Sequence, residues 1–106
     1  MLKIYGKNTK RGFLVTLSGS LDFQSHNDLK KFLAKELDGV RHLILNMENV
    51  DYVSSAGFGV ILEAEQIMEK KGDMVLVNVQ PQVLDVMEAI GFLGVLNIDN
   101  LGDYDE

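Results

Sequence analysis

The chain has 106 residues, of which 46% are apolar and 25% charged, and its formal net charge at pH 7 is −6. This length and composition fit one compact globular domain, expected over residues 1–106. The absence of cysteine excludes disulfides, thiolate metal sites and cysteine nucleophiles, and the excess of acidic residues argues against direct binding to a nucleic-acid backbone.

An opening β-hairpin, a helix and a buried strand are predicted in the first half of the chain. Residues 2–7 alternate weakly and residues 13–17 more strongly, with a turn over residues 8–12. Apolar residues at spacings of three and four then predict a helix over residues 25–37. A strand is predicted over residues 40–47, which are almost continuously apolar from Leu43 onward, as is typical of a strand that is covered on both faces.

Helices and strands alternate in the second half. We expect a helix over residues 56–71, a strand over 74–79, a third helix from Pro81 to Gly91 and a short strand over 95–98. This order predicts an α/β sandwich with a mixed β-sheet, opened by a hairpin and packed by about three to four helices. No signal pattern or membrane-spanning apolar stretch occurs, so we expect a cytoplasmic protein without membrane insertion.

Sites in such sheets gather where the carboxyl end of a strand meets the start of a helix, and residues 47–59 form one such junction. Ser54 and Ser55 precede the predicted helix, where a serine commonly caps the helix by accepting a backbone N–H bond. The same helix start favours a bound phosphate. Gly57 and Gly59 follow, each costing about 1 kcal/mol relative to alanine. We therefore expect close approach there of another backbone or of a partner protein.

One side of the second predicted helix combines apolar and acidic residues. At 3.6 residues per turn, Phe58 and Leu62 fall together, away from the core stripe and beside Glu65 and Glu69. They either dock a partner protein or pack beneath a neighbouring loop, and the sequence leaves both interpretations open. The stripes assigned to the core comprise Gly57, Val60, Ile61, Ala64, Ile67 and Met68 in this helix, and Val83, Val86, Met87 and Ile90 in the third.

Residues with catalytic or metal-binding chemistry are sparse. His26 and His42 are the only histidines, and their spacing does not make a metal pair. Residues 57–59 (Gly-Phe-Gly) lack the third glycine of a dinucleotide-binding loop and the lysine of a phosphate-binding loop. Residues 53–57 match the nucleophile elbow of serine hydrolases poorly. We expect neither an enzyme nor a cofactor or metal site.

Five segments occur in a specific order and spacing. They are residues 17–22 (Leu-Ser-Gly-Ser-Leu-Asp), 43–47 (Leu-Ile-Leu-Asn-Met), Val50 with 52–59 (Tyr-Val-Ser-Ser-Ala-Gly-Phe-Gly), 76–81 (Leu-Val-Asn-Val-Gln-Pro) and 87–92 (Met-Glu-Ala-Ile-Gly-Phe). Together they resemble the STAS domain, the fold of bacterial anti-sigma factor antagonists, over almost the whole chain. Three features depart from the family's usual pattern: Ser54 and Asn46 stand where aspartate is frequent, and the C-terminal helix is cut short to residues 101–106.

The resemblance implies a regulator of transcription that does not touch DNA. In that family the serine two positions before the glycine, here Ser55, is phosphorylated by an anti-sigma factor that is also a serine kinase. The unphosphorylated form binds the anti-sigma factor and releases a sigma factor, and a PPM-type phosphatase removes the phosphate. Related domains also serve in stress-signalling complexes and lipid ABC transporters, which is the alternative. The residues expected at the partner-binding surface are Asp22, which the resemblance places beside the junction, Ser54, Ser55, Ala56, Gly57, Phe58, Gly59 and Leu62.

Overall fold

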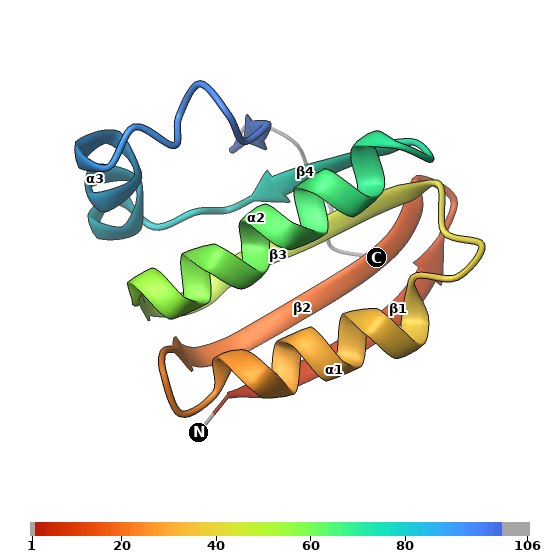
Figure 1. Ribbon diagram of the computed structural model, residues 1–106, viewed down its shortest axis with the longest axis horizontal. Helices are drawn as coiled ribbons and strands as arrows, with labels where there is room; N and C mark the ends of the chain where they lie inside the picture. The colour runs from red at the N-terminus through yellow and green to blue at the C-terminus, as the bar shows by residue number, and fades with distance from the viewer. Residues whose placement is uncertain (1, 101–106) are drawn as a thin grey trace.

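A computed structural model describes residues 2–100, which form two layers, with the helices on one face of a five-stranded sheet (Figure 1). The predicted α/β sandwich with a mixed sheet is confirmed over this range, and it contains three helices, within the predicted three to four. In chain order the elements are β1 Lys3–Thr9, β2 Gly12–Leu21, α1 His26–Glu36, β3 His42–Val53, α2 Ser55–Glu69, β4 Asp73–Val77, α3 Pro81–Ala89 and β5 Ile98–Asp99.

The strands lie in the sheet in chain order, β1-β2-β3-β4-β5. β1 and β2 pair antiparallel as the predicted hairpin, and the remaining neighbours pair parallel. The longest pairing joins β2 to β3 and runs from Phe13 opposite Leu43 to Leu21 opposite Val53, with two shifts of register. Because both strands run this far, the end of β2 lies directly beside the start of α2.

The main core lies between the helices and one face of the sheet. Alternate residues of the strands point to that face, and α1 and α2 lie side by side across it (Figure 1). All three helices contribute to the same cluster of buried side chains. The contributions of the helices are Leu29 and Leu33 from α1, Phe58, Val60, Ile61, Ala64 and Met68 from α2, and Val83 and Met87 from α3.

The opposite face of the sheet carries a second, smaller cluster. Leu14, Ile44 and Val77 are buried there with Val75 packed against them. Leu14 pairs with Ile44 and Ile44 with Val75, and Val77 lies two residues further along β4. Residues 43–47 are buried on both faces, which confirms the interpretation of this segment as a strand that is covered on both sides.

Several strands differ in extent from the sequence prediction. β3 continues beyond residue 47 to Val53, because its polar part still pairs with β2 and keeps Val50 and Val53 buried. The last strand begins at Ile98 and not at residue 95, because the carbonyl of Phe92 accepts bonds from the N–H groups of Val95 and Leu96 and holds this segment in a turn.

Candidate functional site

The junction between β3 and α2 consists of one residue, Ser54. Its extended backbone (φ −82°, ψ 172°) ends the strand, and its N–H donates to the carbonyl of Leu21 at 2.9 Å. Its hydroxyl oxygen accepts a bond from the N–H of Gly57 at 3.2 Å. Ser54 is therefore the N-cap of α2, a role worth about 1 kcal/mol. The end of β2 and the helix start are thereby held together.

Ser55 is the first residue of α2 and is exposed. Within residues 2–100 its hydroxyl makes no hydrogen bond, whereas the hydroxyl of Ser54 is used by the cap. The backbone N–H groups of Ser55 and Ala56 also find no acceptor in this part of the chain, as is usual in a first helical turn. The two adjacent serines thus have different surroundings.

The two glycines of the first turns of α2 also differ. A Cβ atom on Gly57 would lie 2.6 Å from the carbonyl oxygen of Leu21 and 3.0 Å from Cγ1 of Val53. This confirms the expected close approach of another backbone. A Cβ on Gly59 would meet nothing within 4 Å among the described residues. Packing within the domain therefore explains Gly57 but not Gly59, which lies one turn after Ser55 on the same side of the helix.

The expected exposure of Phe58 is wrong. Its side chain is 2% exposed and packs edge-to-face on Phe92, with the ring centroids 5.6 Å apart. The segment after α3 therefore covers this side of α2, and the second interpretation of the sequence, packing beneath a neighbouring loop, is confirmed for this residue. Leu62, one turn later, is half-buried.

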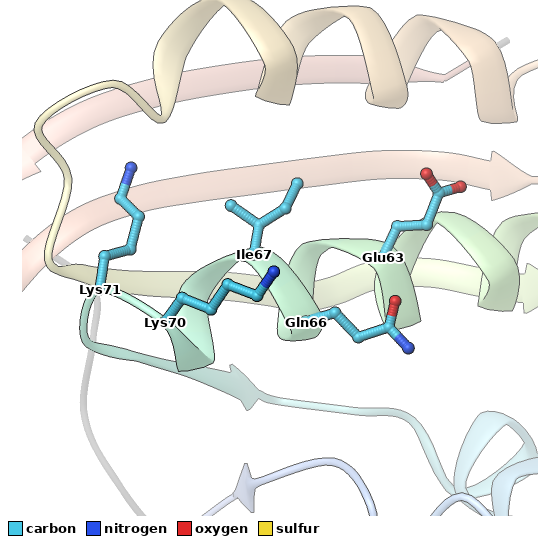
Figure 2. A pocket seen from close by; sticks show the side chains of 5 residues that line it. All are labelled: Glu63, Gln66, Ile67, Lys70 and Lys71. Atoms are coloured by element: carbon cyan, nitrogen blue, oxygen red, sulfur yellow. The ribbon is translucent and has the colours of Figure 1, made fainter.

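Ile67, which the sequence assigned to the core, is 47% exposed. Figure 2 shows it on the side of α2 that faces α1, between Glu63 and Lys71. On this side α1 and α2 are bridged by the Lys30–Glu63 ion pair at 3.7 Å. Val86 and Ile90 of the third helix are likewise 44% and 46% exposed, because α3 buries only Val83 and Met87.

Asp22 lies directly after Leu21, whose carbonyl contacts the junction, so the expected proximity of this loop to Ser54 is confirmed. Its Oδ1 accepts bonds from the N–H groups of Gln24 and Ser25 and lies 3.1 Å from the Ser25 hydroxyl. Desolvation raises the pKa of Asp22, and these hydrogen bonds lower it. Their combined effect is larger than that of desolvation, so the pKa of Asp22 lies below its usual value. The carboxylate thus organises the turn before α1.

Neither histidine ring bonds to a described residue of the junction. Nδ1 of His26 is 2.7 Å from the carbonyl of Phe23, and Nδ1 of His42 is 2.8 Å from a carboxylate oxygen of Asp73. Over residues 2–100, no three His, Asp or Glu side chains gather as metal ligands. None of the helices in the described range has the length and apolar character needed to span a membrane.

A groove lies beside the junction that was not predicted from the sequence. It is lined by the end of β3, by Phe58 of α2 and by Gln82, Val83 and Val86 of α3. The available signal was the spacing of Val86 and Ile90, which are separated by one helical turn. The sequence prediction grouped both with Val83 and Met87 in one apolar stripe, but α3 buries only Val83 and Met87.

Comparison with known proteins identifies the fold at the level of a domain family. The STAS domain family matches residues 5–101, so the chain belongs to the STAS domain family. Solved structures of SpoIIAA agree with this fold at 19% sequence identity. The unphosphorylated form gives a TM-score of 0.76 over 93% of this chain and 90% of that chain. The phosphorylated form, described as a Bacillus cell fate determinant, gives 0.69 over 95% and 93%.

Two relatives are named as anti-sigma factor antagonists. A protein named "Putative anti-sigma factor antagonist BtrV" from Bordetella bronchiseptica is 35% identical over 92 residues, covering 84% of this chain and 79% of the relative. The anti-sigma F factor antagonist of Paenibacillus polymyxa is 25% identical over 100 residues, covering 92% and 86%. The chain is thus similar to anti-sigma factor antagonists over most of its length.

Proposed function

We propose that this protein is an anti-sigma factor antagonist whose affinity for its partner is switched by phosphorylation of Ser55. In its unphosphorylated state it binds an anti-sigma factor and so releases a sigma factor. The anti-sigma factor acts as the serine kinase, and a PPM-type phosphatase restores the active state. The site of action is the cytoplasm, and the protein regulates transcription without contacting DNA.

The observation that carries this proposal is the difference between the two serines. The hydroxyl of Ser54 accepts a bond from the N–H of Gly57 and would be withdrawn from the cap by modification. The hydroxyl of Ser55 is exposed and unbonded within residues 2–100, so a kinase can reach it without disturbing the helix. The two solved forms of SpoIIAA, unphosphorylated and phosphorylated, lend support from a protein of the same fold.

A phosphate on Ser55 should leave the fold intact for electrostatic reasons. It adds about −1.5 to −2 charges at a helix N-terminus, where negative charge is stabilised. No Lys or Arg occurs in residues 42–69, so that stretch, which includes Ser55 and all of α2, offers the phosphate no cation. The group therefore stays hydrated at the surface. A partner must remove that hydration or be excluded, and a loss of about 3 kcal/mol would lower the affinity more than a hundredfold.

Gly59 supports a protein surface at this place. It leaves bare helical backbone one turn after Ser55, where a side chain would meet no described atom. Glycine in a helix costs about 1 kcal/mol relative to alanine, and no contact within the described domain offsets that cost. Close approach by a partner's backbone accounts for the residue.

The test begins with capture of partners from the native cytoplasm by the unphosphorylated chain. We expect an anti-sigma factor with a kinase domain, and the recovered kinase is then incubated with the chain and ATP. Mass spectrometry should place the phosphate on Ser55. Ser55→Ala should bind the kinase but resist phosphorylation, and Ser55→Asp should bind at least a hundredfold more weakly.

Ser54→Ala is the matched control. It should lower the free energy of unfolding by about 1 kcal/mol through loss of the cap while still accepting phosphate on Ser55. Phosphate on Ser54 alone, or on neither serine, contradicts the proposal. Recovery of a transporter ATPase or of a stress-signalling assembly in place of a kinase would favour the alternative kind of STAS protein.

A further inference from the structure

The groove between the end of β3 and α3 has the shape and composition of a docking site for an apolar side chain. It has a volume of about 130 Å³. Its floor and walls are formed by Val53, Phe58 and Val83, which are buried. At its rim, Tyr52 and Val86 are 55% and 44% exposed. Large apolar side chains gathered around a hollow are typical of protein-interaction surfaces.

The apolar surface continues along α3. Ile90 follows Val86 by four residues and therefore lies on the same side of the helix, and it is also half exposed. Tyr52 reaches this surface from the neighbouring strand, because it lines the groove together with Val86. We call this surface, made of Tyr52, Val86, Ile90 and the groove between them, the α3 patch.

The charged residues of the groove lining and of α3 are all acidic. Asp51 lines the groove, and Asp85 and Glu88 are exposed on α3. No Lys or Arg occurs in residues 42–69 or in residues 72–106. The two lysines between these ranges, Lys70 and Lys71, lie at the other end of α2 from the groove (Figures 1 and 2). Complementarity therefore calls for a positively charged partner.

Strand addition does not suit this surface, although β3 has an unpaired edge here. β4 pairs with β3 only as far as Asn46. Beyond that point, side chains from the start of α3 bond to the edge: Nε2 of Gln80 donates to the carbonyl of Glu48 at 2.7 Å, and Nε2 of Gln82 to that of Asp51 at 3.4 Å. Because these carbonyls are already bonded, an incoming segment gains more from apolar side chains inserted into the groove than from backbone pairing.

We infer that the α3 patch binds a basic amphipathic helix of the anti-sigma factor, with an apolar side chain of that helix seated between Tyr52 and Val86. This inference rests on the proposed function for the identity of the partner. The groove begins at Phe58, which lies three residues after Ser55, so a partner that covers the phosphorylation site reaches the groove within one helical turn. Unphosphorylated Ser55 and the α3 patch then form one continuous binding surface.

The chemistry of the patch is tested first with peptides of known composition. Two synthetic helical peptides share a leucine face, and their flanks carry lysine in one and glutamate in the other. Titrated into the ¹⁵N-labelled full chain, the lysine peptide should shift the amide resonances of Tyr52, Val86 and Ile90, whereas the glutamate peptide should not. Shifts confined to other surfaces overturn the assignment.

A pair of variants separates apolar docking from general attraction of cations. Val86→Asp and Ile67→Asp each add one negative charge at a β-branched, half-exposed position of a helix, but only Val86 lines the groove. Attraction by charge alone would make both variants bind the lysine peptide more tightly. We expect Val86→Asp to bind at least tenfold more weakly and Ile67→Asp to bind no more weakly than the original chain. Equal effects of the two variants refute the groove. Val86→Ser gives the same test if circular dichroism shows that Val86→Asp is unfolded.

The same variants are then titrated with the kinase recovered by the chain. At least tenfold weaker binding by Val86→Asp, with Ile67→Asp unchanged, supports the inference. If Ser55→Asp weakens binding but Val86→Asp does not, the switch stands and the role of the α3 patch is refuted. If the lysine peptide binds the groove but no anti-sigma factor binds the chain, the partner assignment fails together with the proposed function.

Discussion

Replacing each of the two glycines of α2 by alanine should change stability in opposite directions. In both cases the helix gains about 1 kcal/mol from the better helix former. At Gly57 the new Cβ would lie 2.6 Å from the carbonyl oxygen of Leu21, and this oxygen belongs to the backbone of a paired strand that cannot move freely. Forced contacts of this kind cost about 1–3 kcal/mol. Because this contact is so short, we expect the upper part of that range and a net loss of about 1–2 kcal/mol for Gly57→Ala.

At Gly59 no described atom lies within 4 Å of the new Cβ, so the helix propensity is not offset. Gly59→Ala should therefore raise the free energy of unfolding by about 0.5–1 kcal/mol. In a domain of this size that corresponds to an increase of about 2–4 °C in Tm. If a partner's backbone approaches this surface, the same methyl group should weaken binding of the anti-sigma factor about tenfold.

Urea and thermal unfolding, followed by far-ultraviolet circular dichroism, measure the two stabilities, and a titration with the recovered kinase measures the affinity. A Gly57→Ala variant as stable as the original chain, or a Gly59→Ala variant less stable than it, would contradict the prediction. A Gly59→Ala variant that is more stable but binds with unchanged affinity would remove Gly59 from the binding surface and leave its presence unexplained.

Two further predictions concern Phe58 and Asp22. Phe58→Ala should lower the free energy of unfolding by about 3–5 kcal/mol, because it empties a buried site against Phe92; a folded variant with unchanged Tm in chemical and thermal unfolding would contradict this. The lowered pKa of Asp22 means that its carboxylate stabilises the fold above the unfolded-state pKa of about 4, and that this contribution is lost as the pH falls through the folded-state pKa. Unfolding measured from pH 7 to pH 2 should therefore show the stability difference between the original chain and Asp22→Asn shrinking on acidification, and a constant difference would show that the charge of Asp22 is not involved.

The order and type of the elements could be predicted from the sequence because periodicity and turn residues point to the same structure. Apolar residues at helical spacing mark α1 and α2, Pro81 marks the start of α3, and the continuous run at residues 43–47 marks a strand buried on both faces. The length of β3 could not be predicted, because its polar end is held by pairing with β2, which is a contact between segments distant in sequence.

The sequence predicted the strand-to-helix junction where the candidate site lies, but it did not predict which side chains around the junction are exposed. A helical projection assumes one buried stripe, and it cannot show that residues after α3 cover the Phe58 side of α2. Nor can it show that Ile67, on the opposite side of α2 and near its end, is left partly exposed to solvent. The separate roles of Ser54 and Ser55 depend on the residue at which the helix begins. If the predicted start moves by one residue, the cap moves from one serine to the other, and a sequence prediction of a helix end is not that exact.

The single-residue connection between β3 and α2 has a consequence for the speed of signalling. Ser54 is tied to β2 through its backbone and to the helix through its hydroxyl, so the junction contains no loop that could rearrange when a phosphate arrives. If the phosphate acts only through its charge and hydration, removing it should restore full affinity at once. The time needed to reset the regulator would then equal the turnover time of the phosphatase, without a refolding phase, and the chain would retain no memory of its previous state.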